Sequence, residues 1–226
     1  MTDLALSRVD KFLAGVSARP ASRGNLVFAL DATASRERTW DTACQLQARM
    51  FQEVAMIGSL SMQLVYFRGA QDCGGECKAS RWVDNPADLA SIMTKIRCDA
   101  GYTQIERVLS HVAREAISGR KISALVFVGD ACEEERDQLI EPASRLAQLG
   151  VPAFIFQEGH DLNARGRFQE IARITRGVYL AFDQGAARQL SELLRAVAAF
   201  SVGGTIALER QSSAAAKYML QQIKSR

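Results

Sequence analysis

The sequence lacks any run of about 18 consecutive apolar residues, the length that a membrane-spanning helix needs. Its first residues, MTDLALSRVDKFLAG, carry charges where a signal peptide needs a continuous apolar segment. We therefore expect a cytoplasmic protein that does not enter a membrane. The 226 residues are enough to bury a sizeable core, and α/β chains of this length commonly form one domain.

A concentrated surface of positive charge is also missing. The 28 lysines and arginines are balanced by 25 aspartates and glutamates, for a net charge of +3, and no Lys/Arg stripe of the kind that marks nucleic-acid binders is present. Glycine-rich phosphate-binding patterns are absent as well, because no GxGxxG follows the first apolar run and no GK[ST] occurs. Nucleic acids and nucleotides are therefore not expected as ligands.

Cysteine and histidine are scarce and irregularly spaced. Five cysteines in a chain without an export signal favour reduced thiols over a disulfide framework. Cys73 and Cys77 flank Gly-Gly-Glu and could be half of a zinc site, but a structural zinc needs four ligands and no second Cys/His pair stands at ligand spacing. His111 and His160 are isolated from each other, and we expect His111 on the exposed flank of a helix.

The chain does contain a regular alternation of strand-like and helix-like segments. Short apolar runs typical of strands alternate with segments whose apolar residues recur every three or four positions, as in amphipathic helices. Strands alternating with helices of this length indicate a parallel sheet covered on both faces. The expected strands are 25–32, 61–69, 77–84, 122–131, 151–157 and 177–182, and the expected helices are 3–17, 36–56, 86–96, 105–116, 135–149, 164–175 and 186–200.

The third expected strand departs from the parallel pattern. Only about eight residues separate it from the second strand, too few for a parallel crossover, so the two form an antiparallel hairpin. Lys78 and Arg81 suit an edge strand. We predict a Rossmann-like, doubly wound, mainly parallel six-stranded α/β sheet with one antiparallel edge strand and helices on both faces. It occupies residues 25–200, between an N-terminal helix and connector (1–24) and a helical tail (201–226).

Oxygen-bearing side chains collect where these strands end. The stretch ALDATAS places Asp31, Thr33 and Ser35 at alternating positions after the first strand, and FVGDA ends the fourth strand with Asp130. If the fourth strand lies on the opposite side of the first strand from the second and third, the two aspartates are neighbours where the strand order reverses, which is where ligands bind in such sheets. Thr103 follows a DAGY loop and begins a helix.

Two neighbouring carboxylates repel each other unless one is protonated or a cation lies between them. The nearby hydroxyl groups favour the cation, because a hard divalent ion such as magnesium takes oxygen ligands. Helix capping is the other interpretation. Asp31, Asp130 and Thr103 are all residue types favoured at helix N-caps, and Glu106 follows Thr103 at capping-box spacing.

Together, these five residues resemble the metal-ion-dependent adhesion site (MIDAS) of von Willebrand factor type A (VWA) domains. They occur in the same order along the chain and at the corresponding ends of predicted strands and helices. The residues are Asp31, Thr33, Ser35, Thr103 and Asp130. The similarity covers roughly residues 25–200, and stretches such as ALDATASR and GDACEE look like a bacterial intracellular subgroup of these domains. The resemblance implies a magnesium or manganese ion held by Asp31, Thr33, Ser35, Thr103 and Asp130. Thr33 stands where the family pattern more often has serine.

Three further acidic residues lie close to these positions in the sequence. Asp99, Glu133 and Glu134 are candidates to support the ligands without touching the ion. For Glu133 and Glu134, together with Glu135, the sequence favours a solvated first helical turn, and support of the site is the alternative.

The resemblance implies a non-enzymatic, metal-dependent protein-binding module whose ion is completed by an acidic residue of a partner. An AAA+ ATPase or a chaperone system is the kind of partner that it suggests. The alternative is a metal-dependent phosphohydrolase with Asp31 as nucleophile. Such an enzyme needs a second acid two residues later, where this chain has Thr33, and a lysine that does not follow Asp130 closely.

Overall fold

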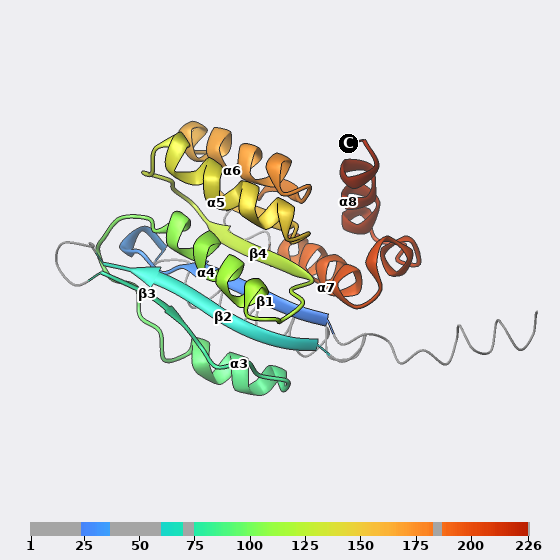
Figure 1. Ribbon diagram of the computed structural model, residues 1–226, viewed down its shortest axis with the longest axis horizontal. Coiled ribbons are helices and arrows are strands. Elements are labelled where there is room, and N and C mark those ends of the chain that lie inside the picture. Colours follow the sequence, from blue (N-terminus) through green and yellow to red (C-terminus); the bar gives the residue numbers. More distant parts are fainter. Residues whose placement is uncertain (1–23, 37–59, 70–74, 183–186, 226) are drawn as a thin grey trace, which may run out of the picture.

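The computed structural model describes residues 24–36, 60–69, 75–182 and 187–225. Six strands form one sheet in the order β3-β2-β1-β4-β5-β6 (Figure 1). Strand β3 pairs antiparallel with β2, and every other neighbouring pair is parallel. The predicted sheet with one antiparallel edge strand is thus confirmed. The strands are β1 (Gly24–Asp31), β2 (Leu60–Arg68), β3 (Glu76–Ala79), β4 (Ala124–Gly129), β5 (Ala153–Glu158) and β6 (Val178–Phe182).

Helices cover both faces of the sheet, as predicted. Along β1, Leu26, Phe28 and Leu30 pack into one apolar cluster, while Val27 and Ala29 pack into the other. The first cluster includes residues of α3, α7 and α8, and the second includes residues of α4, α5 and α6. Burial on both faces explains why the strands read as unbroken apolar runs. The helices are α3 (Pro86–Met93), α4 (Ile105–Ile117), α5 (Arg136–Gln148), α6 (Leu162–Ile174), α7 (Ala187–Glu209) and α8 (Ala214–Lys224), with a short 3-10 turn, η1 (Ala34–Arg36).

Several predictions lie on segments that the structure does not describe. The helices expected at 3–17 and 36–56 fall outside the described residues, and so does Cys73. Elsewhere the elements match the sequence pattern with small shifts at their ends. The third strand, expected to reach residue 84, is shorter than predicted, because β3 ends at Ala79 and Val83 returns to the sheet through a bridge to Met62.

Helix α7 includes a stretch, Ser191–Glu209, that is long and apolar enough to cross a membrane by length and composition alone. In the structure Leu193, Leu194 and Val197 of this stretch are buried in the core. The helix runs past its expected end at 200, and Gly203 and Gly204 then interrupt it with non-helical backbone angles before α8 follows. Packing on the sheet therefore accounts for the apolar composition of α7.

An aromatic stack anchors the second cluster. The ring of Phe127 in β4 lies parallel to that of Phe67 in β2, with centroids 6.2 Å apart, and meets Phe168 of α6 edge-on at 5.4 Å. All three side chains are fully buried. The stack joins two strands and a helix across the middle of the sheet.

Removing this ring tests the packing. We expect Phe127→Ala to lower the free energy of unfolding by about 3–5 kcal/mol, because it leaves a cavity among side chains that hold one another in place. Urea denaturation followed by circular dichroism measures the change. Replacing the exposed Leu162, whose side chain is 74% accessible, by alanine serves as the control and should change stability far less.

Candidate metal site

Asp31 is the last residue of β1 and is fully buried. One carboxylate oxygen, Oδ1, accepts a hydrogen bond from the backbone N–H of Thr33 over 2.8 Å. This bond tightens the turn that leaves the strand, and the N–H of Ala32 donates to the carbonyl of Phe67 at the end of β2 over 3.0 Å. The start of the loop is therefore fixed to the sheet on one side.

Asp130 follows β4, the strand on the other side of β1. Leu30 is opposite Val128 in the parallel register, so the next residues, Asp31 and Gly129, also lie side by side. A Cβ atom on Gly129 would lie 3.4 Å from the Cβ of Asp31 and 2.8 Å from the ring of Phe127, which is why glycine fits here. The two aspartates thus end adjacent strands at the point where the strand order reverses, as expected from the sequence.

The Oδ1 atom of Asp130 is buried and accepts no hydrogen bond from any residue that the structure describes. Burying a carboxylate oxygen without a donor is costly, and such oxygens in proteins are normally hydrogen-bonded or bound to a cation. This arrangement fits the binding of a cation between the two strand ends.

Hydroxyl groups stand beside the carboxylates. The Oγ1 atom of Thr33 and the Oγ atom of Ser35 are 3.1 Å apart, so they share one hydrogen bond. Thr33 is buried, whereas Ser35, in η1, is exposed. Each hydroxyl oxygen keeps lone pairs that a hard cation can use.

The loop before α4 brings Thr103 to the same edge. The N–H of Asp99 donates to the carbonyl of Ala32 over 3.1 Å, and Asp99 also bridges with Thr33. Further along, a Cβ atom on Gly101 would lie only 2.1 Å from the backbone carbon of Gly69, so this position requires glycine. The loop is thereby held against the ends of both β1 and β2.

The side chain of Thr103 is bound by the loop that follows β4. Its hydroxyl donates to Oε2 of Glu134 over 2.7 Å and accepts from the N–H of Glu133 over 3.0 Å, while its own N–H donates to Oε2 of Glu133 over 2.9 Å. One lone pair of the hydroxyl remains for a cation, and the proton is directed towards the acid. The two glutamates thus support Thr103, and they do not form a merely solvated helical turn.

Glu134 also caps α4. Its Oε1 atom accepts from the N–H of Glu106 over 2.8 Å, while the N-cap residue of α4, Gln104, forms no side-chain capping bond. Desolvation on burial raises the pKa of the Glu134 carboxyl, and the hydrogen bonds from Glu106 and Thr103 oppose the rise. Capping by a residue 28 positions away in the sequence could not be read from local spacing.

The capping interpretation fails at two of its three residues. Thr103 precedes the N-cap of α4 and bonds to the 133–134 loop, and the N-cap of α5 is Glu135, five residues after Asp130. Asp31 closes a local turn by accepting from the N–H of Thr33. Capping therefore does not explain why two acids meet at one edge.

The other candidate groups do not form a metal site. No group of three or more His, Cys, Asp or Glu side chains is arranged to hold an ion among the described residues, so any ion here depends on hydroxyl ligands. Asp99 is exposed and its Oδ1 atom accepts from the N–H of Ala100, next to it in the chain. Burial raises the pKa of the half-buried Cys132 thiol, beside Glu134, to about 12, which keeps it protonated.

Comparisons with known proteins agree on the architecture. No protein-family model matches the sequence, and no curated protein sequence matches it. Solved structures do. A von Willebrand factor type A protein from Catenulispora acidiphila matches with a TM-score of 0.60 and 16% identity, covering 80% of this chain and 43% of that one. The chain has a VWA fold.

Two further VWA structures extend the comparison. The VWA domain of SpRpn10 matches with a TM-score of 0.55 and 12% identity over 74% of this chain and 95% of that domain. Proximal thread matrix protein 1 from the mussel byssus, described with a zinc-occupied MIDAS motif, matches with a TM-score of 0.59 and 16% identity over 79% of this chain and 45% of that one. The VWA fold can thus carry a divalent ion at such a site in another protein.

The raised pKa of Glu134 predicts a pH effect. Because the folded state binds this proton more tightly than the unfolded state does, the group's contribution to stability is fully present below the ordinary glutamate pKa. It is lost as the pH rises through the folded pKa. We therefore expect the stability of wild type relative to Glu134→Gln to decline over that pH range, in urea titrations with chelator present.

The control for this experiment is Glu141→Gln. Glu141 is on the exposed face of α5, where it pairs with Arg145. This variant should keep the pH dependence of the wild type. A Glu134→Gln variant that follows the wild type in parallel at every pH would show that Glu134 does not titrate abnormally.

Proposed function

We propose that this VWA domain is a protein-binding module that depends on a divalent ion, magnesium or manganese, at the edge where β1 and β4 end. The observation that carries the proposal is at Asp130, next to the buried Asp31. The Oδ1 atom of Asp130 is buried and accepts no hydrogen bond from any residue that the structure describes. Asp31, Ser35, Thr103 and Asp130 would hold the ion. Thr33 would position Ser35 through their shared hydrogen bond or contribute its own oxygen.

The ligand set favours a site that accepts a further anion. Two carboxylates supply two negative charges, and the other ligands are neutral hydroxyl groups, so a bound divalent ion keeps the capacity to attract an outside carboxylate. When bound, the ion supplies an open coordination position for that group. Glu133 and Glu134 orient Thr103 by accepting its protons, which directs the hydroxyl oxygen towards the ion.

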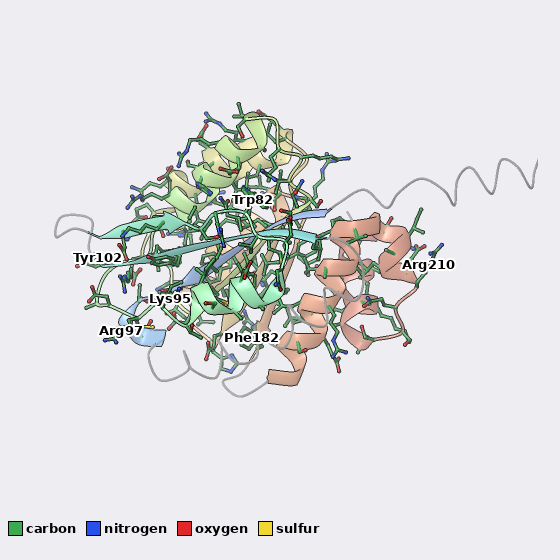
Figure 2. All side chains as sticks on the ribbon, turned by 90° about the horizontal axis from the view of Figure 1, so that it is seen from below. Trp82, Lys95, Arg97, Tyr102, Phe182 and Arg210 are labelled. Atoms are coloured by element: carbon green, nitrogen blue, oxygen red, sulfur yellow. The ribbon has the colours of Figure 1, made fainter. Side chains whose placement is uncertain are left out.

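The surface beside the site suits a protein partner. Tyr102, next to Thr103, is 64% exposed, and Figure 2 shows it at the opposite end of the molecule from Arg210, which follows α7. Exposed tyrosines are enriched in protein interfaces because they combine apolar area with a hydroxyl group. An acidic side chain of the partner would complete the ion while neighbouring groups contact Tyr102.

The chemistry of the edge favours binding over catalysis. A phosphohydrolase that used Asp31 as its nucleophile would need an acid at position 33, and the hydroxyl of Thr33 is too weak an acid to protonate a leaving group. We therefore propose a non-enzymatic role. An AAA+ ATPase or chaperone partner is the part of this proposal that the family resemblance suggests, and a cytoplasmic location is the part that the charged, interrupted apolar segments of the sequence suggest.

Metal binding is tested on the purified protein. We expect isothermal titration to show magnesium or manganese binding to wild type and none to Asp31→Asn or Asp130→Asn, since each substitution removes a charged ligand. Without metal, Asp130→Asn should be at least as stable as wild type, because it removes a buried charge. With metal at about 100 times its dissociation constant, wild type should gain about 2.7 kcal/mol.

The matched control is Asp137→Asn, which makes the same chemical change at a side chain that is 94% exposed in α5. It should bind metal like wild type. Equal metal affinity in wild type and Asp130→Asn would refute the site.

Partner binding is tested with the ion as the variable. We expect a partner to be retained by the immobilised domain in magnesium, released by chelator, and not retained by Asp130→Asn. Replacing the partner's contacting Asp or Glu by its amide should abolish retention in magnesium, because the ion then lacks its outside carboxylate. If the partner is still retained in chelator and by Asp130→Asn, its binding does not depend on the ion and the proposal is wrong.

A further inference from the structure

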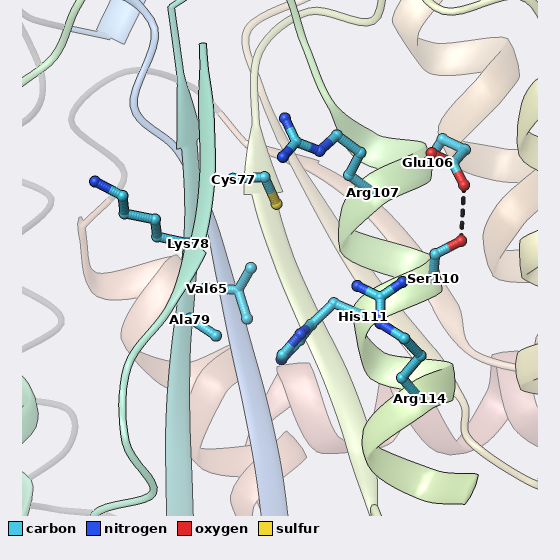
Figure 3. A pocket seen from close by; sticks show the side chains of 9 residues that line it. All are labelled: Val65, Cys77, Lys78, Ala79, Glu106, Arg107, Ser110, His111 and Arg114. Carbon is cyan, nitrogen blue, oxygen red and sulfur yellow. Dashed lines mark hydrogen bonds between the residues drawn. The ribbon is translucent and has the colours of Figure 1, made fainter. Parts of the chain in front are cut away.

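A cavity of about 190 Å³ lies between the edge strand β3 and the flank of α4 (Figure 3). Cys77 of β3 lines one side, and Arg107, Ser110, His111 and Arg114 of α4 line the other. Arg107, His111 and Arg114 are four and three positions apart, so they lie on one side of α4. None of them was singled out as a binding residue from the sequence.

The two arginines are not neutralised by the protein. Arg107 donates to the amide oxygen of Gln104, a neutral acceptor, and Arg114 forms no ion pair with any residue that the structure describes. Seven residues, or about two turns, separate them along α4. Two cationic groups therefore border one cavity, and neither forms an ion pair with a residue that the structure describes.

The other charged groups that line the cavity are Lys78 and Glu106. Lys78 forms an ion pair with Glu76, and Figure 3 shows its side chain directed away from α4. The carboxylate of Glu106 accepts the hydroxyl proton of Ser110 over 2.7 Å, on the side of the helix farther from the strands. Glu106 keeps its negative charge, so the lining carries two guanidinium groups against one carboxylate that no described cation pairs with.

The remaining polar side chains at the cavity are neutral. Burial raises the pKa of the Cys77 thiol to about 11, although Arg107 and Arg114 oppose the rise, so the thiol carries no negative charge near neutral pH. Burial lowers the pKa of His111, whose Nε2 atom is 2.9 Å from Oε1 of Gln63. His111 is thus half-buried against the sheet, and its expected place on an exposed flank is wrong.

We propose that this cavity binds a single oxyanion group of the phosphate monoester type, held by the guanidinium groups of Arg107 and Arg114. Planar guanidinium groups match the oxygens of a phosphate and remain charged at every physiological pH. The doubly charged phosphate suits a pair of unneutralised arginines better than a carboxylate does. The volume fits one such group and is below the range of about 300–1,000 Å³ that is usual for drug-sized ligands.

A phosphate monoester could come from a free small molecule or from a phosphorylated side chain of another protein. Both sources present the same charged group, and they differ in what surrounds it. The experiment therefore uses inorganic phosphate, a short phosphoserine peptide and the same peptide without phosphate as probes of the full chain at constant ionic strength.

We expect inorganic phosphate at millimolar concentration to shift the backbone amide resonances of 75–79 and 105–114, and the unphosphorylated peptide to leave them unchanged. Tighter binding of the phosphoserine peptide would identify a protein source, and tighter binding of inorganic phosphate a free one. Arg107→Gln and Arg114→Gln should each weaken binding by about tenfold or more, the loss expected for a charge-assisted hydrogen bond. Arg145→Gln, on the exposed face of α5, should bind like wild type.

A second measurement guards against misfolded variants. Alkylation of Cys77, followed by peptide mass spectrometry, should slow when phosphate fills the cavity in wild type and Arg145→Gln, and stay unchanged in the Arg107→Gln, Arg114→Gln double variant. The proposal is overturned if phosphate neither shifts these resonances nor protects Cys77. It is equally overturned if the double variant, folded by circular dichroism, binds phosphate as tightly as wild type does.

Discussion

The candidate site depends on one arrangement: Asp31 and Asp130 stand at the ends of two adjacent parallel strands, β1 and β4. The parallel register of β1 with β4 puts Asp31 beside Gly129, and the absence of a side chain on Gly129 lets Asp130 follow directly at the same edge. Asp31 ends a buried strand and Asp130 directly follows another, so the sheet fixes where both backbones lie. The sheet thus brings two acidic residues to one edge, and the proposed divalent ion would relieve the repulsion between their carboxylates.

The loops around these acids form one connected unit. Glu134 links the hydroxyl of Thr103 to the first turn of α4 through the N–H of Glu106, and Glu133 holds the backbone of Thr103. The N-terminus of α4 is therefore fixed by the loop after β4 and lacks a cap from its own segment. Any displacement of that loop would move a proposed ligand and loosen the helix together, so the geometry of the edge and the position of α4 are coupled.

The fold was largely predictable because each buried parallel strand is a continuous apolar run and each helix shows its apolar stripe. Asp31 and Asp130 were recognisable for the same reason, since an acid that ends such a run stands out. The environment of His111 was wrongly predicted, because its partner is 48 residues away in the sequence and amphipathic spacing places it at the margin of the polar face. Arg107 and Arg114 belong to that polar face too, and only the position of the short strand β3 turns this part of it into the wall of a cavity.

Charge is distributed unevenly over a chain whose net charge is only +3. The edge at the ends of β1 and β4 carries Asp31, Asp99, Asp130, Glu133 and Glu134, and without an ion it would repel an acidic partner. A bound divalent ion reverses the interaction at the point of contact while the surrounding acids still repel acidic surfaces that lack a group placed to reach it. If the ion binds as proposed, it would therefore do more than add a contact: it would decide whether an acidic partner can approach this edge at all.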